Sequence, residues 1–482
     1  MRRSVFLARS AGVMAALAVP RLPARALAED TLDYTLTAAP IAFSPAPGMQ
    51  YPLLAFNGSI PGPVIRVAQG QRLRAKFVNS SGKPATVHWH GMILPNRMDG
   101  VEDITQAPVP SGDSFLYDFV AQPAGTRWYH DHVGGGLPRG LFGLIVVEDP
   151  NDEHYDAEFA LVFHDVPNLP TIEQAMMGVS GAPMVDPIGS PEMREMEPND
   201  KMGDEVAYVA HCINGRSYPA TQKLPVKVGQ RVRLRVLNAN PTQTRYVRLA
   251  DHRLTVTHTD GNRLEAPVTV DALRIGVAER YDAWFEVQKP GAWLLQGLSS
   301  EPTAYQQAAV VYTEGFENAA PAASPQTLEG VEFFTYEGAG GVGPSMPQGA
   351  SMPQHDKTPQ HDYNFTLGGG AYGSNAWTIN GKTYPHTPKI FVTRGDAVTI
   401  HFKNTTDMDH PMHLHGHVFR LTSVDGKPLL RPLPKDTALV RAHGGTATWH
   451  FTADSPPGRW LLHCHNEIHM MDGMRTEVVY RS

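Results

Sequence analysis

Three side chains near the end of the chain together supply the donors of a soft transition-metal site. Cys464 provides a thiolate, His469 an imidazole and Met474 a thioether. This set is typical of a blue-copper electron-transfer centre, which needs one further histidine. His410 is the predicted fourth ligand, because it stands outside the regular spacing of the histidines that follow it. Zinc fits less well, since structural zinc sites are closed by four ligands that include several cysteines.

Eight other histidines come in pairs separated by a single residue. Residues two apart on a β-strand point to the same face of the sheet, so each pair can present both imidazoles to one site. Eight converging imidazoles would serve a cluster of three metal ions with two or three nitrogens each, which leaves room for oxygen. The pairs are His88/His90, His130/His132, His413/His415 and His463/His465.

The residues around Cys464 connect the two predicted sites. The apolar run 460–462 precedes the cysteine and follows a Pro-Pro-Gly turn, which predicts a β-strand. Side chains alternate along a strand, so His463 and His465 are predicted to point to one side and Cys464 to the other. One strand would therefore supply ligands to two sites that lie back to back.

The elements that carry these residues are predicted to be β-strands. Short runs such as 226–236 and 390–402 are rich in Val, Ile and Phe, and turns with Gly, Pro and Asn separate them. No long stretch has a convincing helical periodicity. The sequence therefore predicts an all-β protein built of sandwiches.

A motif that occurs three times divides the chain into modules. An Asn-Gly pair, a proline, a Gly-Gln or Gly-Asp pair and a later asparagine recur in one order, and the interval from the second glycine to that asparagine is the same in each copy. Such repetition indicates three copies of one structural unit. The copies run from Asn57-Gly58 to Asn79, from Asn214-Gly215 to Asn238 and from Asn380-Gly381 to Asn404.

The ends of the three modules differ in their ligands. Where the third has His463-Cys464-His465, the first has His130-Asp131-His132 and the second has Gln296-Gly297-Leu298. The metal cluster is therefore predicted to lie between the first and third modules, with the second as a spacer or wall. The predicted division is a signal segment at 1–28, modules at 29–150, 151–320 and 362–482, and a linker at 321–361 that is rich in Gly, Pro, Ala and Gln.

The first 28 residues have the features of a secretory signal. Arg2-Arg3 precede an apolar run, 11–19, and a small-residue ending, 26–28, and the arginine pair indicates the twin-arginine route. That run is too short to cross a bilayer, and no later stretch qualifies. Cleavage removes five arginines and changes the formal net charge from −7 to −12, which argues against nucleic acid as a partner.

The histidine and cysteine motifs together resemble the four copper motifs of multicopper oxidases, over the whole mature chain. The motifs are His88-Trp89-His90-Gly91, His130-Asp131-His132, 410–415 and the run from His463-Cys464-His465 to His469 and Met474. The resemblance implies three consecutive cupredoxin-like Greek-key β-sandwich domains and four copper ions. The implied ligands are His410, Cys464, His469 and Met474 for type 1, His88 and His413 for type 2, and His90, His130, His132, His415, His463 and His465 for the type 3 pair.

The resemblance also implies the reaction. Four single electrons would leave a small reducing substrate at the type 1 copper and pass through 463–465 to the trinuclear cluster, where O2 becomes water. Asp99 stands where many family members carry a proton-relay aspartate, although an aspartate before glycine is also a common turn. Several bacterial laccases have a glutamate where this chain has Met470, so the second relay acid is not identified; Glu467 is nearby.

Two reducing substrates remain open. The loop 469–474 resembles the copper-resistance branch more than fungal laccases, and methionines at 176–202 and 346–361 could deliver Cu(I), which thioethers select. Methionine also fills irregular gaps, in which case phenols and aromatic amines are the expected substrates. A protein that sequesters copper with little oxidase turnover is the alternative to an enzyme. The overall prediction is a periplasmic or secreted monomer without a membrane span.

Overall fold

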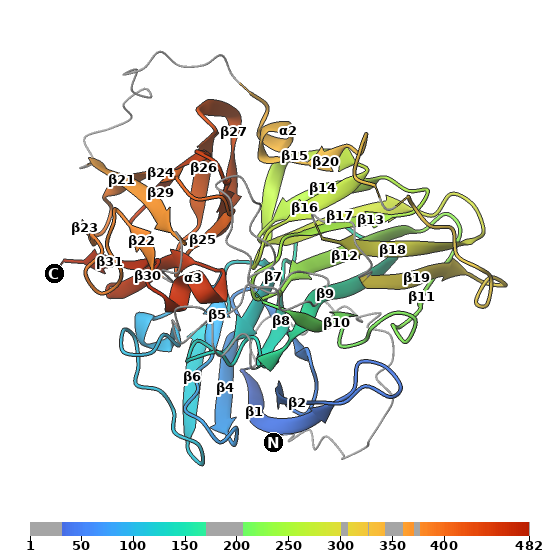
Figure 1. Ribbon diagram of the computed structural model, residues 1–482, viewed down its shortest axis with the longest axis horizontal. Helices are drawn as coiled ribbons and strands as arrows, with labels where there is room; N and C mark the ends of the chain where they lie inside the picture. Colours follow the sequence, from blue (N-terminus) through green and yellow to red (C-terminus); the bar gives the residue numbers. More distant parts are fainter. Residues whose placement is uncertain are drawn as a thin grey trace, which may run out of the picture.

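The described residues form six β-sheets that pair into three cupredoxin-like domains, which confirms the predicted all-β sandwich fold. The computed structural model describes residues 31–169, 206–299, 307–325, 327–342, 360–370 and 376–481, so the predicted signal segment lies outside the described residues. In Figure 1 the first domain (blue) lies below, the second (green) to the right and the third (orange to red) to the left, and the three meet near the centre.

The first domain packs two four-stranded sheets against each other. Burial alternates along the strand Arg72–Asn79, where Leu73, Ala75 and Phe77 point into the core. One sheet, in spatial order, contains β2 (Tyr51–Phe56), β1 (Leu32–Phe43), β4 (Arg72–Asn79) and β6 (Ser114–Val120). The other contains β3 (Gly62–Ala68), β8 (Phe142–Glu148), β7 (Gly125–His130) and β5 (His88–His90), and a 3-10 helix, η2, spans Asn96–Met98.

The second domain has two six-stranded sheets. Its central strand Ala292–Leu298 is buried at every residue, because it lies between neighbours within its sheet and faces the other sheet. One sheet contains β10 (Tyr208–Ile213), β9 (Ala157–Pro167), β12 (Arg231–Asn238), β17 (Arg280–Glu286), β14 (Leu254–Thr259) and β15 (Asn262–Val270). The other contains β11 (Leu224–Val226), β19 (Gln307–Thr313), β18 (Ala292–Leu298), β13 (Arg245–Leu249), β16 (Ala272–Ile275) and β20 (Phe333–Phe334).

The third domain pairs a six-stranded sheet with a five-stranded sheet, and the second of these carries four of its eight predicted ligands. The first contains β22 (Trp377–Ile379), β21 (Gln360–Gly369), β24 (Ala397–Asn404), β29 (Thr446–Thr452), β26 (Phe419–Val424) and β27 (Lys427–Lys435). The second contains β23 (Ile390–Val392), β31 (Arg475–Tyr480), β30 (Arg459–Cys464), β25 (His410–Leu414) and β28 (Thr437–Val440). A short helix, α3 (Glu467–Met471), follows β30.

The sequence repeat corresponds to a repeated local structure. Each Asn-Gly pair adopts positive φ at both residues, as a two-residue turn of this type requires. The later asparagine is fully buried in every copy, and its amide nitrogen donates to two backbone carbonyls, one in the loop that follows it and one in a segment farther along the chain. The three asparagines, Asn79, Asn238 and Asn404, therefore fasten equivalent loops to equivalent strands.

Part of the predicted linker has regular structure. Strand β20 pairs with β16 of the second domain, and helix α2 (Tyr336–Gly340) lies between β15 and β27. Phe334 and Tyr336 are buried, so these residues gain more from packing than a solvated linker would. The segment thus connects the second and third domains through a packed contact (Figure 1).

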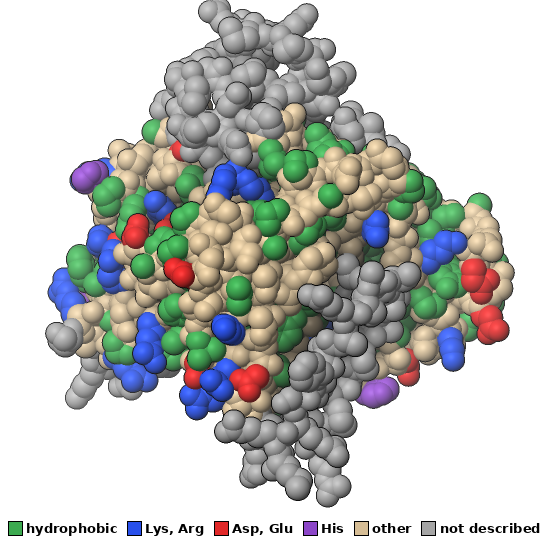
Figure 2. All heavy atoms as spheres, turned by 90° about the horizontal axis from the view of Figure 1, so that it is seen from below, with side chains coloured by type: hydrophobic (Ala, Val, Ile, Leu, Met, Phe, Trp, Pro, Cys, Tyr) green, Lys and Arg blue, Asp and Glu red, His purple; other side chains and the backbone are tan. Residues whose placement is uncertain are grey.

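Two features of the described residues concern membranes and surface charge. Within the described ranges, no helix is long and apolar enough to cross a membrane. The face shown in Figure 2 carries Lys and Arg side chains interspersed with Asp and Glu, and its hydrophobic side chains form small separate groups.

Substitution of Gly125, at the start of β7, tests how closely the first two domains pack. Gly125 has φ +123°, and a Cβ there would lie 1.9 Å from the carbonyl oxygen of Gly261 in the second domain. Gly112 has φ +100° but has nothing within 4 Å of the same position, so it is a matched control for backbone strain. We expect Gly112→Ala to cost about 1–2 kcal/mol from its left-handed backbone alone. Gly125→Ala should cost about 1–3 kcal/mol more, because the interface must shift.

Chemical denaturation of both variants measures the difference. Equal loss of stability in Gly125→Ala and Gly112→Ala would contradict the close domain contact.

Candidate metal centre

The predicted ligands meet where the first and third domains face each other. Strands β5 and β7 of the first domain approach β25 and β30 of the third, and every predicted ligand is at most 3% exposed. Strand pairing within each domain sets the positions: His88 lies opposite His130, and His413 opposite His463. Two separate groups result, one of eight histidines and one around Cys464.

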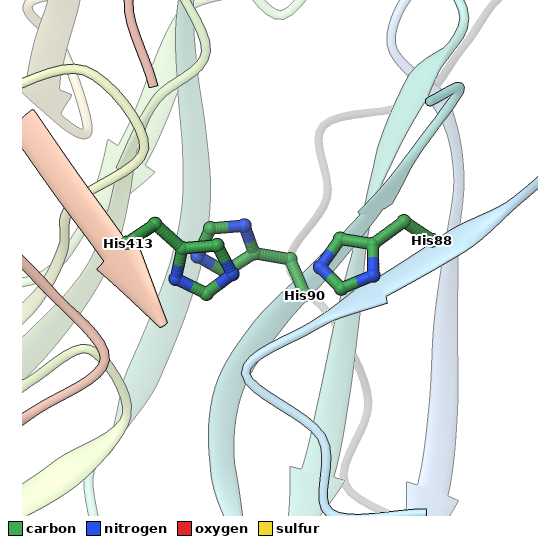
Figure 3. A group of neighbouring side chains, drawn as sticks. All are labelled: His88, His90 and His413. Carbon is green, nitrogen blue, oxygen red and sulfur yellow. The ribbon is translucent and has the colours of Figure 1, made fainter. Parts of the chain in front are cut away.

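The eight histidines converge on one region. In three trios, one ring nitrogen of each residue lies within 4.8 Å of those of the other two. Figure 3 shows one trio, in which His88 and His90 extend from β5 and His413 approaches them from β25. The trios are His88/His90/His413, His90/His130/His465 and His132/His415/His463.

The protein fixes one nitrogen of most of these rings. His88 Nδ1 donates to the Asp99 carbonyl (2.8 Å), His413 Nδ1 to the Asp436 carbonyl (2.8 Å), and His90 Nε2 lies 3.1 Å from Asp436 Oδ1. The opposite nitrogen of six rings is buried without a hydrogen-bond partner in the described structure. These atoms are Nε2 of His88, His130, His132, His413 and His465 and Nδ1 of His90.

A second group forms around Cys464 on the other side of β30. Cys464 Sγ lies 3.4 Å from His469 Nδ1 and 3.6 Å from His410 Nδ1, and these two nitrogens are 2.9 Å apart. Thr406 Oγ1 holds His410 through Nε2 at 2.8 Å, which leaves Nδ1 directed at the sulfur. Met474 is fully buried, and its carbonyl accepts a hydrogen bond from the Cys464 amide (3.0 Å).

The predicted strand at Cys464 is shorter than expected. Strand β30 ends at Cys464, and His465 follows it, with its amide bonded to the Pro411 carbonyl (2.6 Å). The alternation nevertheless places His463 and His465 with the histidine group and Cys464 with the other group. His469 lies on α3, which Asn466 caps by accepting from the amides of Ile468 and His469.

Burial sets the protonation state of the histidines. It lowers the pKa of His90, His410, His413 and His415 well below the ordinary value, and neighbouring histidines lower each further. Burial also lowers the pKa of His465 to about 3. These imidazoles are therefore neutral near pH 7, which is the form that coordinates a metal.

Three acids besides Asp436 lie beside the histidine group. Asp99 is completely buried, and its Oδ2 accepts from His415 Nδ1 (2.9 Å) while Oδ1 has no hydrogen-bond partner. Glu102 accepts from His132 Nδ1 (3.0 Å); burial alone would lower the pKa of His132, but this carboxylate raises it. Glu467 begins α3, and burial raises the pKa of its carboxyl to about 7.

Several residues that contact the centre were not predicted. Ligand rings form hydrogen bonds with Glu102, Asp436, Thr437 and Thr406. The Trp377 indole lies against His469, with ring centroids 3.7 Å apart and ring planes inclined by 30°. The repeat contained a signal for Trp377, which stands three residues before its Asn-Gly pair where the other copies have Leu54 and His211. Asp436 had no comparable signal, because it follows a strand in an unremarkable Lys-Asp-Thr sequence.

The donor atoms fit copper. Two atoms bound to one first-row metal ion at roughly 2.0–2.3 Å are about 2.9–3.6 Å apart. The spacings around Cys464 and the 3.0 Å between His415 Nε2 and His463 Nε2 fall in this range. Imidazole with thiolate favours copper over magnesium, calcium or manganese. Sandwich domains with these two groups define a copper protein of the cupredoxin type.

Comparison with known proteins identifies the family. Models described as multicopper oxidase match residues 37–152, 190–315 and 356–482. The multicopper oxidase MmcO of Mycobacterium tuberculosis is 36% identical over 89% of this chain and 83% of its own, and Laccase-4 of Thanatephorus cucumeris is 28% identical over 87% and 84%. A solved multi-copper oxidase from Pseudomonas thermotolerans superposes with TM-score 0.69 and 27% identity, covering 94% of this chain and 100% of that one.

The chain therefore belongs to the multicopper oxidase family. It is a copper-dependent oxidoreductase with O2 as the electron acceptor.

Two threonines allow the two groups to be perturbed separately. Among the proposed ligand rings, Thr406 Oγ1 contacts that of His410, whereas Thr437 Oγ1 contacts His90 Nε2 (3.1 Å) and His413 Nδ1 (3.2 Å). Loss of such an outer hydrogen bond weakens metal binding by roughly 10–100-fold. We expect Thr406→Val to weaken copper binding only at the thiolate group, and Thr437→Val only at the histidine group.

Chelator competition measures both effects, with the thiolate-to-copper absorption and the type 2 EPR signal as separate readouts. Each variant is the control for the other, and a change in both signals in either variant would contradict the separation.

Proposed function

We propose that this chain holds four copper ions and couples four one-electron oxidations at the Cys464 group to the reduction of O2 to water at the histidine group. Bound copper would supply the one-electron redox chemistry at both places. The proposed type 1 ligands are His410, Cys464, His469 and Met474. The proposed type 2 ligands are His88 and His413, and the other six paired histidines would hold the type 3 ions.

The adjacency of the two groups in the backbone supports this proposal most directly. Cys464 belongs to one group and its immediate neighbours His463 and His465 to the other. The Cys464 carbonyl also accepts a hydrogen bond from His463 Nδ1 (2.8 Å). Electrons that enter at the sulfur thus have a covalent route and a hydrogen-bonded route to the histidine group.

We further propose Asp99 as the residue that delivers protons to the histidine group. Its Oδ2 is bonded to His415, its carbonyl accepts from His88 Nδ1, and its buried Oδ1 lies 3.3 Å from the same His88 nitrogen. A carboxyl in this position reaches both proposed type 2 and type 3 ligands. Glu102, which had no signal in the sequence, is a candidate for a second acid because it contacts His132 directly.

The reducing substrate is proposed as phenols and aromatic amines, Cu(I), or both. Similarity to a protein named as a laccase supports the first. The likeness of the loop 469–474 to the copper-resistance branch supports the second. The methionine segments fall almost wholly outside the described residues; of 346–361, only positions 360 and 361 are described, and His361 is bonded to Asp396 (2.8 Å). Copper sequestration with little turnover remains the alternative function.

The cellular setting is proposed from the sequence. The twin-arginine-type segment 1–28 supports export to the periplasm or beyond. A monomer is proposed as the simplest state of a chain that carries all three modules. The proposed division remains three domains at 29–150, 151–320 and 362–482, with residues 321–361 between the last two.

Oxygen uptake by copper-loaded protein tests the function. We expect consumption of O2 with Cu(I), with a methoxyphenol, or with both, and none in Cys464→Ser, because that variant lacks the thiolate. Phenol turnover without added copper identifies a laccase, whereas Cu(I) turnover with phenol oxidised only after copper is added identifies a cuprous oxidase. Full copper loading without any uptake would leave sequestration as the function.

The proton role of Asp99 predicts a selective defect. Asp99→Asn keeps a similar shape but removes the acid, and loss of a positioned proton donor slows a reaction by about 100-fold or more. We expect slow O2 consumption with normal anaerobic bleaching of the thiolate absorption by substrate. The exposed neighbour Asp103→Asn is the control. Equal oxygen consumption in the two variants would exclude the role.

A further inference from the structure

We propose that Arg280, from the second domain, is a positioning residue for the histidine group and acts through Asp436 of the third domain. The second domain contains none of the proposed ligands, so this assigns it a part in the metal centre beyond that of a wall. The inference rests on the proposed copper cluster.

The contact between the two side chains has the geometry of a strong ion pair. Arg280 Nη1 donates to Asp436 Oδ1 and Nη2 to Asp436 Oδ2, both at 2.6 Å. Both residues are completely buried. Two parallel hydrogen bonds between a guanidinium and a carboxylate fix direction as well as distance, which a lysine at the same place would not do.

Asp436, which the ion pair holds in place, contacts the rings of two proposed ligands. Its Oδ1 lies 3.1 Å from His90 Nε2, and its carbonyl accepts from His413 Nδ1 (2.8 Å). His90 must therefore carry its proton on Nε2, which turns the unpartnered Nδ1 toward the other histidines. Outer hydrogen bonds of this kind set the tautomer and orientation of metal-binding histidines.

Arg280 is itself held rigidly from several directions. Its Nη2 donates to the Asp260 carbonyl (2.9 Å), its Nε to the Thr126 carbonyl (3.2 Å), and its backbone amide to Asp260 Oδ1 (3.0 Å). Asp260 Oδ2 accepts in turn from the amides of Asp436 (3.2 Å) and Thr437 (3.1 Å). The arginine therefore joins all three domains at the edge of the histidine group.

The surrounding charges balance within the buried region. Lys435 Nζ lies 3.0 Å from Asp260 Oδ2 and 2.8 Å from Glu279 Oε1, and Arg127 Nη1 lies 3.5 Å from Asp436 Oδ2. Three cations and three carboxylates are thus buried together. Such a network is stable only when every member is paired, so its geometry is strongly constrained.

A glycine beside His90 shows how close the pair approaches the ligand strand. Gly91 has φ +80°, and a Cβ there would lie 2.6 Å from both Arg280 Nη2 and Asp436 Oδ2. The absence of a side chain at this position lets the ion pair reach the backbone next to the ligand. An interdomain ion pair with a purely structural role would not need this proximity.

Arg280→Lys tests the role because it keeps the charge but loses the two-pronged contact. Arg235→Lys is the matched control: Arg235 is also buried, pairs with Asp282 (2.7 Å) and reaches Thr126 of the first domain (2.9 Å), but contacts no proposed ligand. We expect Arg280→Lys to bind copper at the histidine group roughly 10–100-fold more weakly and to change the type 2 EPR signal. Its thiolate-to-copper absorption should stay at the wild-type value, and Arg235→Lys should change neither signal.

Two outcomes would overturn the inference. One is an Arg280→Lys protein with wild-type copper content and EPR signal; the other is an equal loss in Arg235→Lys. If Arg280→Lys does not fold, Asp436→Asn replaces it and should give the same selective signature, and its absence would likewise overturn the role. Wild-type protein that binds copper only at Cys464 would instead refute the proposed cluster, and the role of Arg280 with it.

Discussion

The structure depends on imidazole rings whose two nitrogens have different roles. The protein holds one nitrogen of most rings by a hydrogen bond, and the other nitrogen points into a buried space that the rings share. A buried polar atom without a partner costs about 1–3 kcal/mol, so six such nitrogens in one place are unfavourable unless a ligand pairs with them. The rest of the fold keeps these atoms close despite that cost. Strand pairing fixes the backbones, and carbonyls and carboxylates at the outer nitrogens fix the rings.

The three domains share a scaffold but differ in what it carries. The buried asparagine near the end of the repeat fastens the same loop in each copy. In the third copy, that loop also contains Thr406. Its backbone amide donates to Asn404 Oδ1, and its hydroxyl contacts the His410 ring. In the second copy, the residues aligned with the metal ligands are Gln296 and Leu298, which are buried in the domain core. The second domain contributes buried charge instead, through Asp260, Glu279 and Arg280.

The two metal groups lie back to back because one strand separates them. Successive side chains at the end of β30 point in opposite directions, so substrate oxidation and oxygen reduction can be divided between two environments only a few bonds apart. The Cys464 side is covered by Trp377 and α3, whereas the histidine side is enclosed between two domains. This division follows from strand geometry.

The sequence by itself determined the fold class, the three-fold repeat and the residues that could bind copper. Alternation along strands and the spacing of His-x-His pairs are local properties, so they can be recognised without coordinates. Only the tertiary structure decided which rings share a trio, since His90, His130 and His465 come from three separate segments. It also brought in Asp436, Arg280 and Glu102, whose contacts with ligand rings or with one another join residues far apart in the chain. Strand β30 ends at Cys464, one residue earlier than predicted, because the His465 amide bonds to the Pro411 carbonyl and Asn466 then caps helix α3.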